Sequence, residues 1–158
     1  MSGRSLAALL ALCVVVAGCG GSGAGQHAPA PSRLSDAELA AATVRRQMQA
    51  VARGDGEAAC ALFSPRALQE VLDQVSRRAG DIGCVAAVQQ GAAGLSAGVR
   101  AALRRPAITR VDVRGARATV RVRLPAALTA LAREAGRVRD GIPLRLIDGR
   151  WRVDGLAL

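Results

Sequence analysis

The sequence predicts one α+β domain, in which N-terminal helices pack on an antiparallel sheet. Three observations carry this prediction. Apolar residues recur at helical spacing from Ser35 to Arg105, and they alternate with a period of two after Pro106. Near the C-terminus, Asp148-Gly149 separates two alternating runs, as in a β-hairpin. A chain of 158 residues has room for one such domain with a core, once a leader and a linker are subtracted.

Residues 1–18 have the features of a secretory signal peptide. Arg4 is followed by an apolar run from Leu6 to Ala17 that is too short to span a bilayer. Val16-Ala17-Gly18-Cys19 then resembles the lipobox of bacterial lipoproteins, although an ordinary cleavage site with an incidental cysteine is the alternative. The resemblance implies cleavage before Cys19 and a lipid anchor on it, and therefore an extracytoplasmic protein at the cell membrane. Several acyl chains, each stabilised by roughly 0.8 kcal/mol per buried CH₂, make that anchor durable.

Residues 19–34 are interpreted as the lipidated cysteine and a flexible tether. The stretch from Gly20 to Ser32 is rich in Gly and Ser and spans roughly 20 Å. It contains His27, the single histidine, which has no Cys, Asp or Glu nearby. We therefore interpret His27 as part of the linker and not as a metal ligand or a base. The folded domain is predicted to cover residues 35–158.

Capping signals predict the helices. Ser35 and Glu38 form a capping box that begins a helix ending at Gly54. Asp55 caps a short second helix, and Ser64-Pro65 begins a third.

The following helices have weaker signals. We expect Asp81 to cap a short helix that carries Cys84 and is broken from Gly91 to Gly94. A last helix, from Ser96 to Arg105, stops before Pro106.

Two hairpins are predicted for the sheet. Around Arg114-Gly115, Val113 is expected to pair with Ala116, which leaves one apolar and one arginine-rich face. Around Asp148-Gly149, a type I′ turn pairs Ile147 with Arg150 and Leu146 with Trp151. The segment 125–141 fits either a short helix or an extension of two long strands.

The cysteines predict a disulfide. If Cys19 carries lipid, Cys60 and Cys84 remain as an even pair in an oxidising compartment. A bond between them would stabilise the fold by roughly 3 to 4 kcal/mol on the chain-entropy model. The rival, a two-cysteine metal site, lacks further ligands for zinc, so no metal is expected.

This order of parts resembles a known family. Helices containing GDGEAAC, followed by strands ending in DGRWRVDGL, are similar to the nuclear transport factor 2-like superfamily, in particular its secreted actinobacterial lipoproteins. The resemblance implies a cone, in which a curved antiparallel sheet wraps the helices and leaves a pocket. A helical hairpin followed by a separate meander is the alternative, but it would leave the apolar faces of the helices uncovered.

Charge and aromatic content argue against a nucleic-acid partner. The formal net charge is +10, all basic residues are arginine, and one Phe and one Trp leave no platform for base stacking. A GC-rich coding bias explains this composition. The arginines of the sheet are interpreted as its solvated face. The alternative is contact with anionic envelope polymers through Arg117, Arg121, Arg123, Arg145 and Arg152.

Catalytic chemistry is not apparent in the sequence. Isomerase-like and dehydratase-like members of the resembled superfamily use a pocket Asp or His and often a Tyr, whereas this chain has no Tyr and its His lies in the tether. The predicted registers place Asp112 and Asp154 on the outward face. An enzyme of that kind remains the alternative.

We therefore predict a non-catalytic, lipid-anchored domain without a cofactor. It binds a small apolar ligand, or a protein or a second copy of the chain through the sheet. Plain core is the alternative role for the residues expected to line the pocket, which are Val120, Leu144, Trp151 and Val153.

Overall fold

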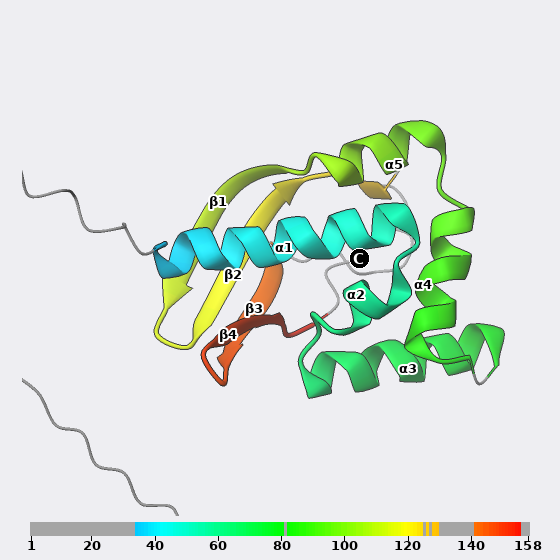
Figure 1. The fold of residues 1–158 in the computed structure, drawn as a ribbon, viewed down its shortest axis with the longest axis horizontal. Helices are drawn as coiled ribbons and strands as arrows, with labels where there is room; N and C mark the ends of the chain where they lie inside the picture. Colours follow the sequence, from blue (N-terminus) through cyan, green and yellow to red (C-terminus); the bar gives the residue numbers. More distant parts are fainter. Residues whose placement is uncertain (1–33, 81, 125, 127, 130–140, 156–158) are drawn as a thin grey trace, which may run out of the picture. The chain divides into compact units, whose positions relative to one another are not determined.

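The structure is a computed structural model that describes residues 34–80, 82–124, 126, 128–129 and 141–155. These residues belong to one compact unit, Arg33–Leu158. The described part has an α+β fold with five helices and an open, four-stranded antiparallel sheet in the order β1-β2-β3-β4 (Figure 1). The predicted leader, Cys19, His27 and most of segment 125–141 lie outside the described residues. Among the described helices, none has the length and apolar character needed to cross a membrane.

Helix α1, Asp36–Arg53, begins and ends where the sequence predicts. The Ser35 hydroxyl accepts a hydrogen bond from the backbone N–H of Glu38 at 3.3 Å, and the Glu38 carboxylate accepts one from the backbone N–H of Ser35 at 2.7 Å. Gly54, with a φ of 70°, ends the helix in the left-handed conformation. The capping box is therefore confirmed.

Helices α2, Gly56–Cys60, and α3, Pro65–Ala79, have the predicted N-caps Asp55 and Ser64. A disulfide joins Cys60 of α2 to Cys84 of α4, Cys84–Ala93, which confirms that prediction. The two helices also approach each other closely at Gly56, where an added Cβ would lie 2.6 Å from the carbonyl oxygen of Val85. A side chain at this position would separate the two helices.

The weaker helix signals were partly misleading. Helix α4 begins after Gly83, which offers no side-chain cap, and Asp81 lies outside the described residues. The helix runs through Gly91 and ends only at Gly94, so the predicted break at Gly91 is wrong. A single glycine costs a helix only about 1 kcal/mol. Helix α5, Ala97–Arg104, follows its predicted cap Ser96.

The second hairpin has the predicted register. Strands β3, Ile142–Ile147, and β4, Arg150–Val153, pair Ile147 with Arg150 and Leu146 with Trp151. Asp148 and Gly149 both have positive φ, 49° and 70°, as a type I′ turn requires.

The first hairpin differs from the prediction by two residues. Between β1, Ala107–Arg114, and β2, Arg117–Arg123, Val113 pairs with Ala118 and not with Ala116. Gly115 is the first loop residue, with a φ of 56°, whereas the prediction made it the second. A shift of two residues keeps every side chain on its face, so the predicted apolar face is preserved.

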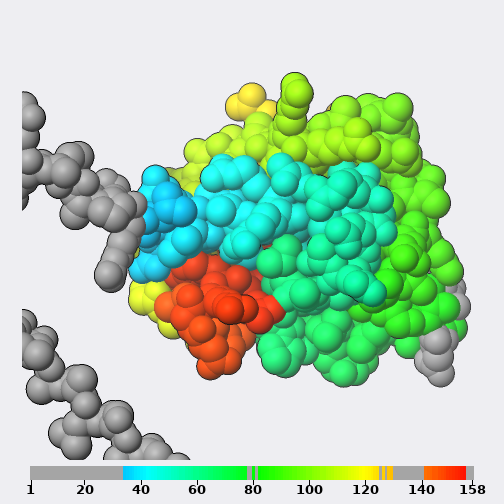
Figure 2. All heavy atoms as spheres, viewed as in Figure 1, coloured from blue at the N-terminus to red at the C-terminus, as the bar shows by residue number. Residues whose placement is uncertain are grey.

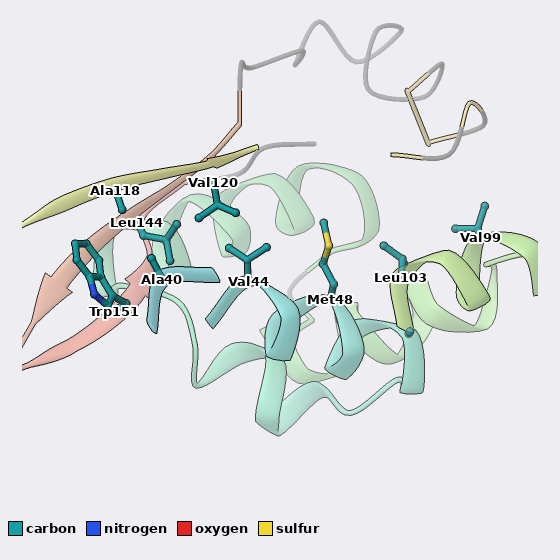
Figure 3. Close-up of a cluster of buried hydrophobic side chains, with 10 residues drawn as sticks. Ala40, Val44, Met48, Val99, Leu103, Ala118, Val120, Leu144 and Trp151 are labelled. Atoms are coloured by element: carbon teal, nitrogen blue, oxygen red, sulfur yellow. The ribbon is translucent and has the colours of Figure 1, made fainter. Parts of the chain in front are cut away.

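The core lies between α1 and the sheet. Figure 1 shows the strands along the N-terminal half of α1 and helices α2, α4 and α5 around its C-terminal half. Val44 of α1 and Val120 of β2 are fully buried, and Leu144 and Trp151 are nearly so (Figure 3). Because α1 covers the sheet, its apolar side chains and those of the strands exclude water from each other.

Candidate functional site

A cavity of about 240 Å³ opens beside the core, between α1, α5 and the strands β3 and β4. We call it the apolar cavity. Its volume lies below the range of roughly 300–1,000 Å³ that is usual for small-molecule sites, which favours a small ligand. Its lining residues are almost all apolar: Gln47, Met48, Val51, Phe63, Leu95, Leu103, Leu128, Ile142, Val153 and Gly155.

Among the described residues, Gln47 is the one polar side chain in this wall. It is 9% exposed, and its Oε1 atom is buried without a hydrogen-bond partner in the described part of the chain. A buried acceptor left unpaired costs about 1–3 kcal/mol, which a ligand hydroxyl or N–H group would recover. The sequence prediction missed Gln47. The signal was its place in the stripe formed by Val44, Met48 and Val51, where a polar residue interrupts apolar spacing.

A second recess, of about 440 Å³, lies between α1, the segment after α2 and the β3–β4 hairpin. We call it the hairpin groove. Figure 2 shows these three surfaces meeting on one face of the molecule. Among the described residues, three arginines and no carboxylate line it. Trp151 also lines it, and Nε1 of this residue is buried without a partner in the described part of the chain. The described residues that line it are Leu39, Thr43, Arg46, Ala61, Leu62, Gly149, Arg150, Trp151 and Arg152.

Four arginines form a row across the sheet. Arg114 pairs with Arg117, Arg117 with Arg145, and Arg145 with Arg152, so every strand contributes one. We call this the arginine row. Like charges directly opposite each other destabilise a sheet, which makes the row favourable for an anion.

The other two arginines predicted for anion contact lie further along β2. Arg121 pairs with Arg110, and Arg123 pairs with Ala107. Both side chains are exposed, but they are outside the arginine row.

Asp154 does not face solvent, and this prediction is wrong. The residue is 8% exposed, and its carboxylate accepts a hydrogen bond from Ser64 Oγ at 2.7 Å. Arg66 and Arg145 approach it at 3.3 and 3.2 Å. Strand β4 ends at Val153, so the alternation of faces no longer applies at the next residue.

The direction of the pKa shift of Asp154 indicates whether this carboxylate is suited to acid–base catalysis or to a structural role. Burial by itself raises the pKa, but hydrogen bonds from Ser64 and Arg66, with the charges of Arg66 and Arg145, together lower it below its usual value. A general acid or base works best with a pKa near the ambient pH. Asp154 is therefore ionised at neutral pH, and its partners give it a structural role.

The four residues expected in a pocket have different surroundings. Val153 lines the apolar cavity, and Trp151 lines the hairpin groove. Val120 and Leu144 belong to the buried core cluster. In the described ranges, no group of three His, Cys, Asp or Glu side chains is placed to hold a metal ion.

A third recess, of about 530 Å³, lies beside α4 and α5, and Arg53, Arg100 and Arg104 line it. Arg100 Nε is buried without a partner among the described residues. Arg53 forms an ion pair with Asp55 at 3.7 Å. Arg100 donates from Nη2 to the carbonyl oxygens of Ala92 and Leu95. These contacts close helix ends, and the recess is a weaker candidate.

Comparisons of this chain with models of known protein families, with curated proteins and with solved structures find no match. The geometry of the two recesses therefore carries the functional argument.

Proposed function

We propose that this chain is a non-catalytic binding domain of the cell envelope. Lipid on Cys19 holds it at the membrane on the extracytoplasmic side, and its apolar cavity takes a small apolar ligand with one hydrogen-bond donor. The observation that carries the proposal is that Oε1 of Gln47 has no partner among the described residues, which otherwise form an apolar wall. Pockets of this kind bind through apolar contact and use a few polar groups to orient the ligand.

Membership of the nuclear transport factor 2-like superfamily is part of the proposal. In its support, the helices precede an antiparallel sheet in the chain, and α1 packs along that sheet beside a cavity. A lipid anchor would concentrate the cavity near the membrane, where apolar molecules partition.

The composition of the wall favours binding over catalysis. The amide of Gln47 is neither an acid nor a base near neutral pH, and it is the one polar side chain that the described residues contribute to the wall. Asp154 lies in the sequence between the lining residues Val153 and Gly155, but its carboxylate is held by Ser64, Arg66 and Arg145. An isomerase or a dehydratase would instead need an acid or a base in contact with the ligand.

A matched pair of ligands tests this proposal. Naphthalene rings carrying one hydroxyl (1-naphthol) or one methyl group (1-methylnaphthalene) have similar size, and only the first can donate to Gln47. We expect both to bind, and 1-naphthol to bind about five- to tenfold tighter, as one buried hydrogen bond predicts. Calorimetric titration measures both affinities.

Two variants and a control make the test specific. Gln47→Leu should abolish the preference for 1-naphthol, and Val51→Trp should fill the cavity and weaken both ligands. Leu34→Trp is the control, because Leu34 is 57% exposed and lines neither recess. Failure of both ligands to bind would contradict the cavity, and equal affinity for the two would contradict the role of Gln47.

A further inference from the structure

We propose that the hairpin groove is a binding site for a phosphate group. This site is separate from the apolar cavity and does not depend on what that cavity binds. Three features of the groove support it: its charge, an unpaired buried donor and its position at the end of the arginine row.

The charge of the groove is uncompensated. Arg46 of α1 and Arg150 and Arg152 of β4 line it, and no carboxylate does. In the described part of the chain, no carboxylate lies within ion-pair distance of these three side chains. Arg152 donates from Nη1 to the carbonyl oxygen of Ala61, which fixes the position of the guanidinium. Its other N–H groups can still donate to a ligand. Three guanidinium groups thus line one recess, and no carboxylate of the described residues neutralises them.

The buried donor is Nε1 of Trp151. The residue is 4% exposed, and this atom has no partner among the described residues. In Figure 3 the indole nitrogen lies on the edge of the ring that is farther from Ala118 and Leu144. A buried indole N–H normally has an acceptor, and an oxyanion in the groove would supply one.

A phosphate group fits these donors better than a carboxylate. It carries a charge of about −1.5 to −2 and offers three acceptor oxygens, whereas a carboxylate has one charge and two oxygens. Arginine binds such oxygens in pairs. Leu39 and Leu62 lie in the same wall and would contact the organic part of a phosphate ester. Free phosphate compounds have this chemistry. A phosphoglycerol lipid headgroup is a diester, which presents the same type of oxygen but carries one negative charge and two non-bridging oxygens.

The arginine row adjoins this site. Arg152 is the member of the row that also lines the hairpin groove. The summed positive field of clustered arginines raises the local concentration of anions and their rate of encounter. The row would therefore guide an anion toward the groove.

The chain's one tryptophan gives a direct readout. Its indole N–H is the only indole resonance in a proton–nitrogen correlation spectrum of the full chain. We expect titration with inorganic phosphate, at constant ionic strength in chloride, to shift this resonance saturably. Glycerophosphoglycerol, the soluble headgroup of phosphatidylglycerol, is titrated in parallel.

Charge-matched variants separate the site from general attraction. The double variant Arg46→Gln, Arg150→Gln should weaken binding at least tenfold, since each charged hydrogen bond is worth about that factor. Arg104→Gln, Arg105→Gln removes the same charge from exposed residues outside the groove and should change affinity less than twofold. Trp151→Phe keeps a ring but removes the donor, and calorimetry should show about tenfold weaker binding with an unchanged circular dichroism spectrum.

Each outcome decides the proposal. A shift with both ligands supports a site for phosphate groups in general, and a shift with the headgroup alone supports a lipid source. The absence of a shift with either ligand would overturn the proposal. So would a loss of affinity in the Arg104, Arg105 control as large as in the groove variant.

Discussion

Buried polar groups of two kinds occur in this molecule. Asp154 has a complete set of partners in Ser64, Arg66 and Arg145. Gln47 Oε1, Trp151 Nε1 and Arg100 Nε are buried in the described structure without any. The difference follows position. Asp154 is packed between the start of α3 and the end of β4, whereas Gln47, Trp151 and Arg100 each line a recess.

The partners of Asp154 fasten two parts of the fold together. Ser64 Oγ donates to Asp154 and also accepts from the backbone N–H of Ala67, which caps α3. Two backbone hydrogen bonds run beside it, from the Ser64 N–H to the Val153 carbonyl and from the Val153 N–H to the Leu62 carbonyl, both at 2.8 Å. The cluster therefore ties the start of α3 to the end of the sheet. A buried polar group that already has its hydrogen-bond partners gains no further hydrogen bond from a ligand. A buried polar group without a partner does gain one.

The largest effect on stability should follow removal of the Asp154 carboxylate, which has all its hydrogen-bond partners. In Asp154→Ala, the hydroxyl of Ser64, which is 1% exposed, loses its acceptor. Arg66 and Arg145 are about half exposed and regain water, so their release costs little. We expect the free energy of unfolding, measured by urea denaturation at pH 7, to fall by about 2–3 kcal/mol.

A matched control is the same substitution at Asp112. Its carboxylate forms an ion pair with Arg110 at 2.8 Å, but both side chains are substantially exposed. Exposed pairs contribute about 0–1 kcal/mol, so Asp112→Ala should change stability by no more than that. Equal losses in the two variants would mean that the burial of Asp154 does not matter.

A smaller effect should appear in the pH dependence of stability. The pKa of Asp154 is lowered in the folded state, so the folded protein binds a proton there less readily than the unfolded chain does. The ionised Asp154 therefore contributes to the free energy of unfolding. This contribution is complete above the pKa of Asp in the unfolded chain, about 3.9, and it is lost as the pH falls through the pKa of Asp154 in the folded protein. The difference in unfolding free energy between the wild type and Asp154→Asn should therefore be constant from pH 7 to 5.

Below about pH 4, the difference in unfolding free energy between the wild type and Asp154→Asn should narrow. The change is at most about 1.4 kcal/mol per pH unit, because one proton is involved. Urea denaturation at pH 7, 5 and 3 measures it. A difference that widens on acidification would contradict the assigned direction of the pKa shift.

Local signals made much of the fold predictable. The capping box at Ser35 and the Asp148-Gly149 turn each determine a structure within four residues, and both were confirmed. The disulfide between Cys60 and Cys84 was also confirmed. The turn at Gly115 was less specific, because a glycine suits either of two loop positions and the sequence alone does not choose between them.

The candidate site was harder to predict, because it depends on contacts between distant segments. Asp154 lies one residue beyond β4, where the alternation rule no longer applies, and its hydroxyl partner Ser64 is far away in sequence. Gln47 interrupts an apolar stripe, but only the packing of α5 and β3 around it turns that interruption into a polar group in a cavity. Trp151 was expected in the pocket wall and lines the hairpin groove.

The smallest effect on stability should follow removal of the Gln47 amide, whose Oε1 has no partner among the described residues. Gln47→Leu removes a buried acceptor that has no partner in the described part of the chain and keeps a side chain of similar size. We expect the free energy of unfolding to stay the same or to rise by up to about 1 kcal/mol, because the cost of burying the unpaired group disappears. Gln49→Leu on the same helix is the control, since Gln49 Nε2 donates to the carbonyl oxygen of Arg104 at 3.2 Å. That variant should lose about 0.5–1 kcal/mol in the same urea denaturation experiment. If Gln47→Leu lost more than Gln49→Leu, Gln47 would belong with Asp154 among the groups that hold the fold, and its part in ligand binding would be wrong.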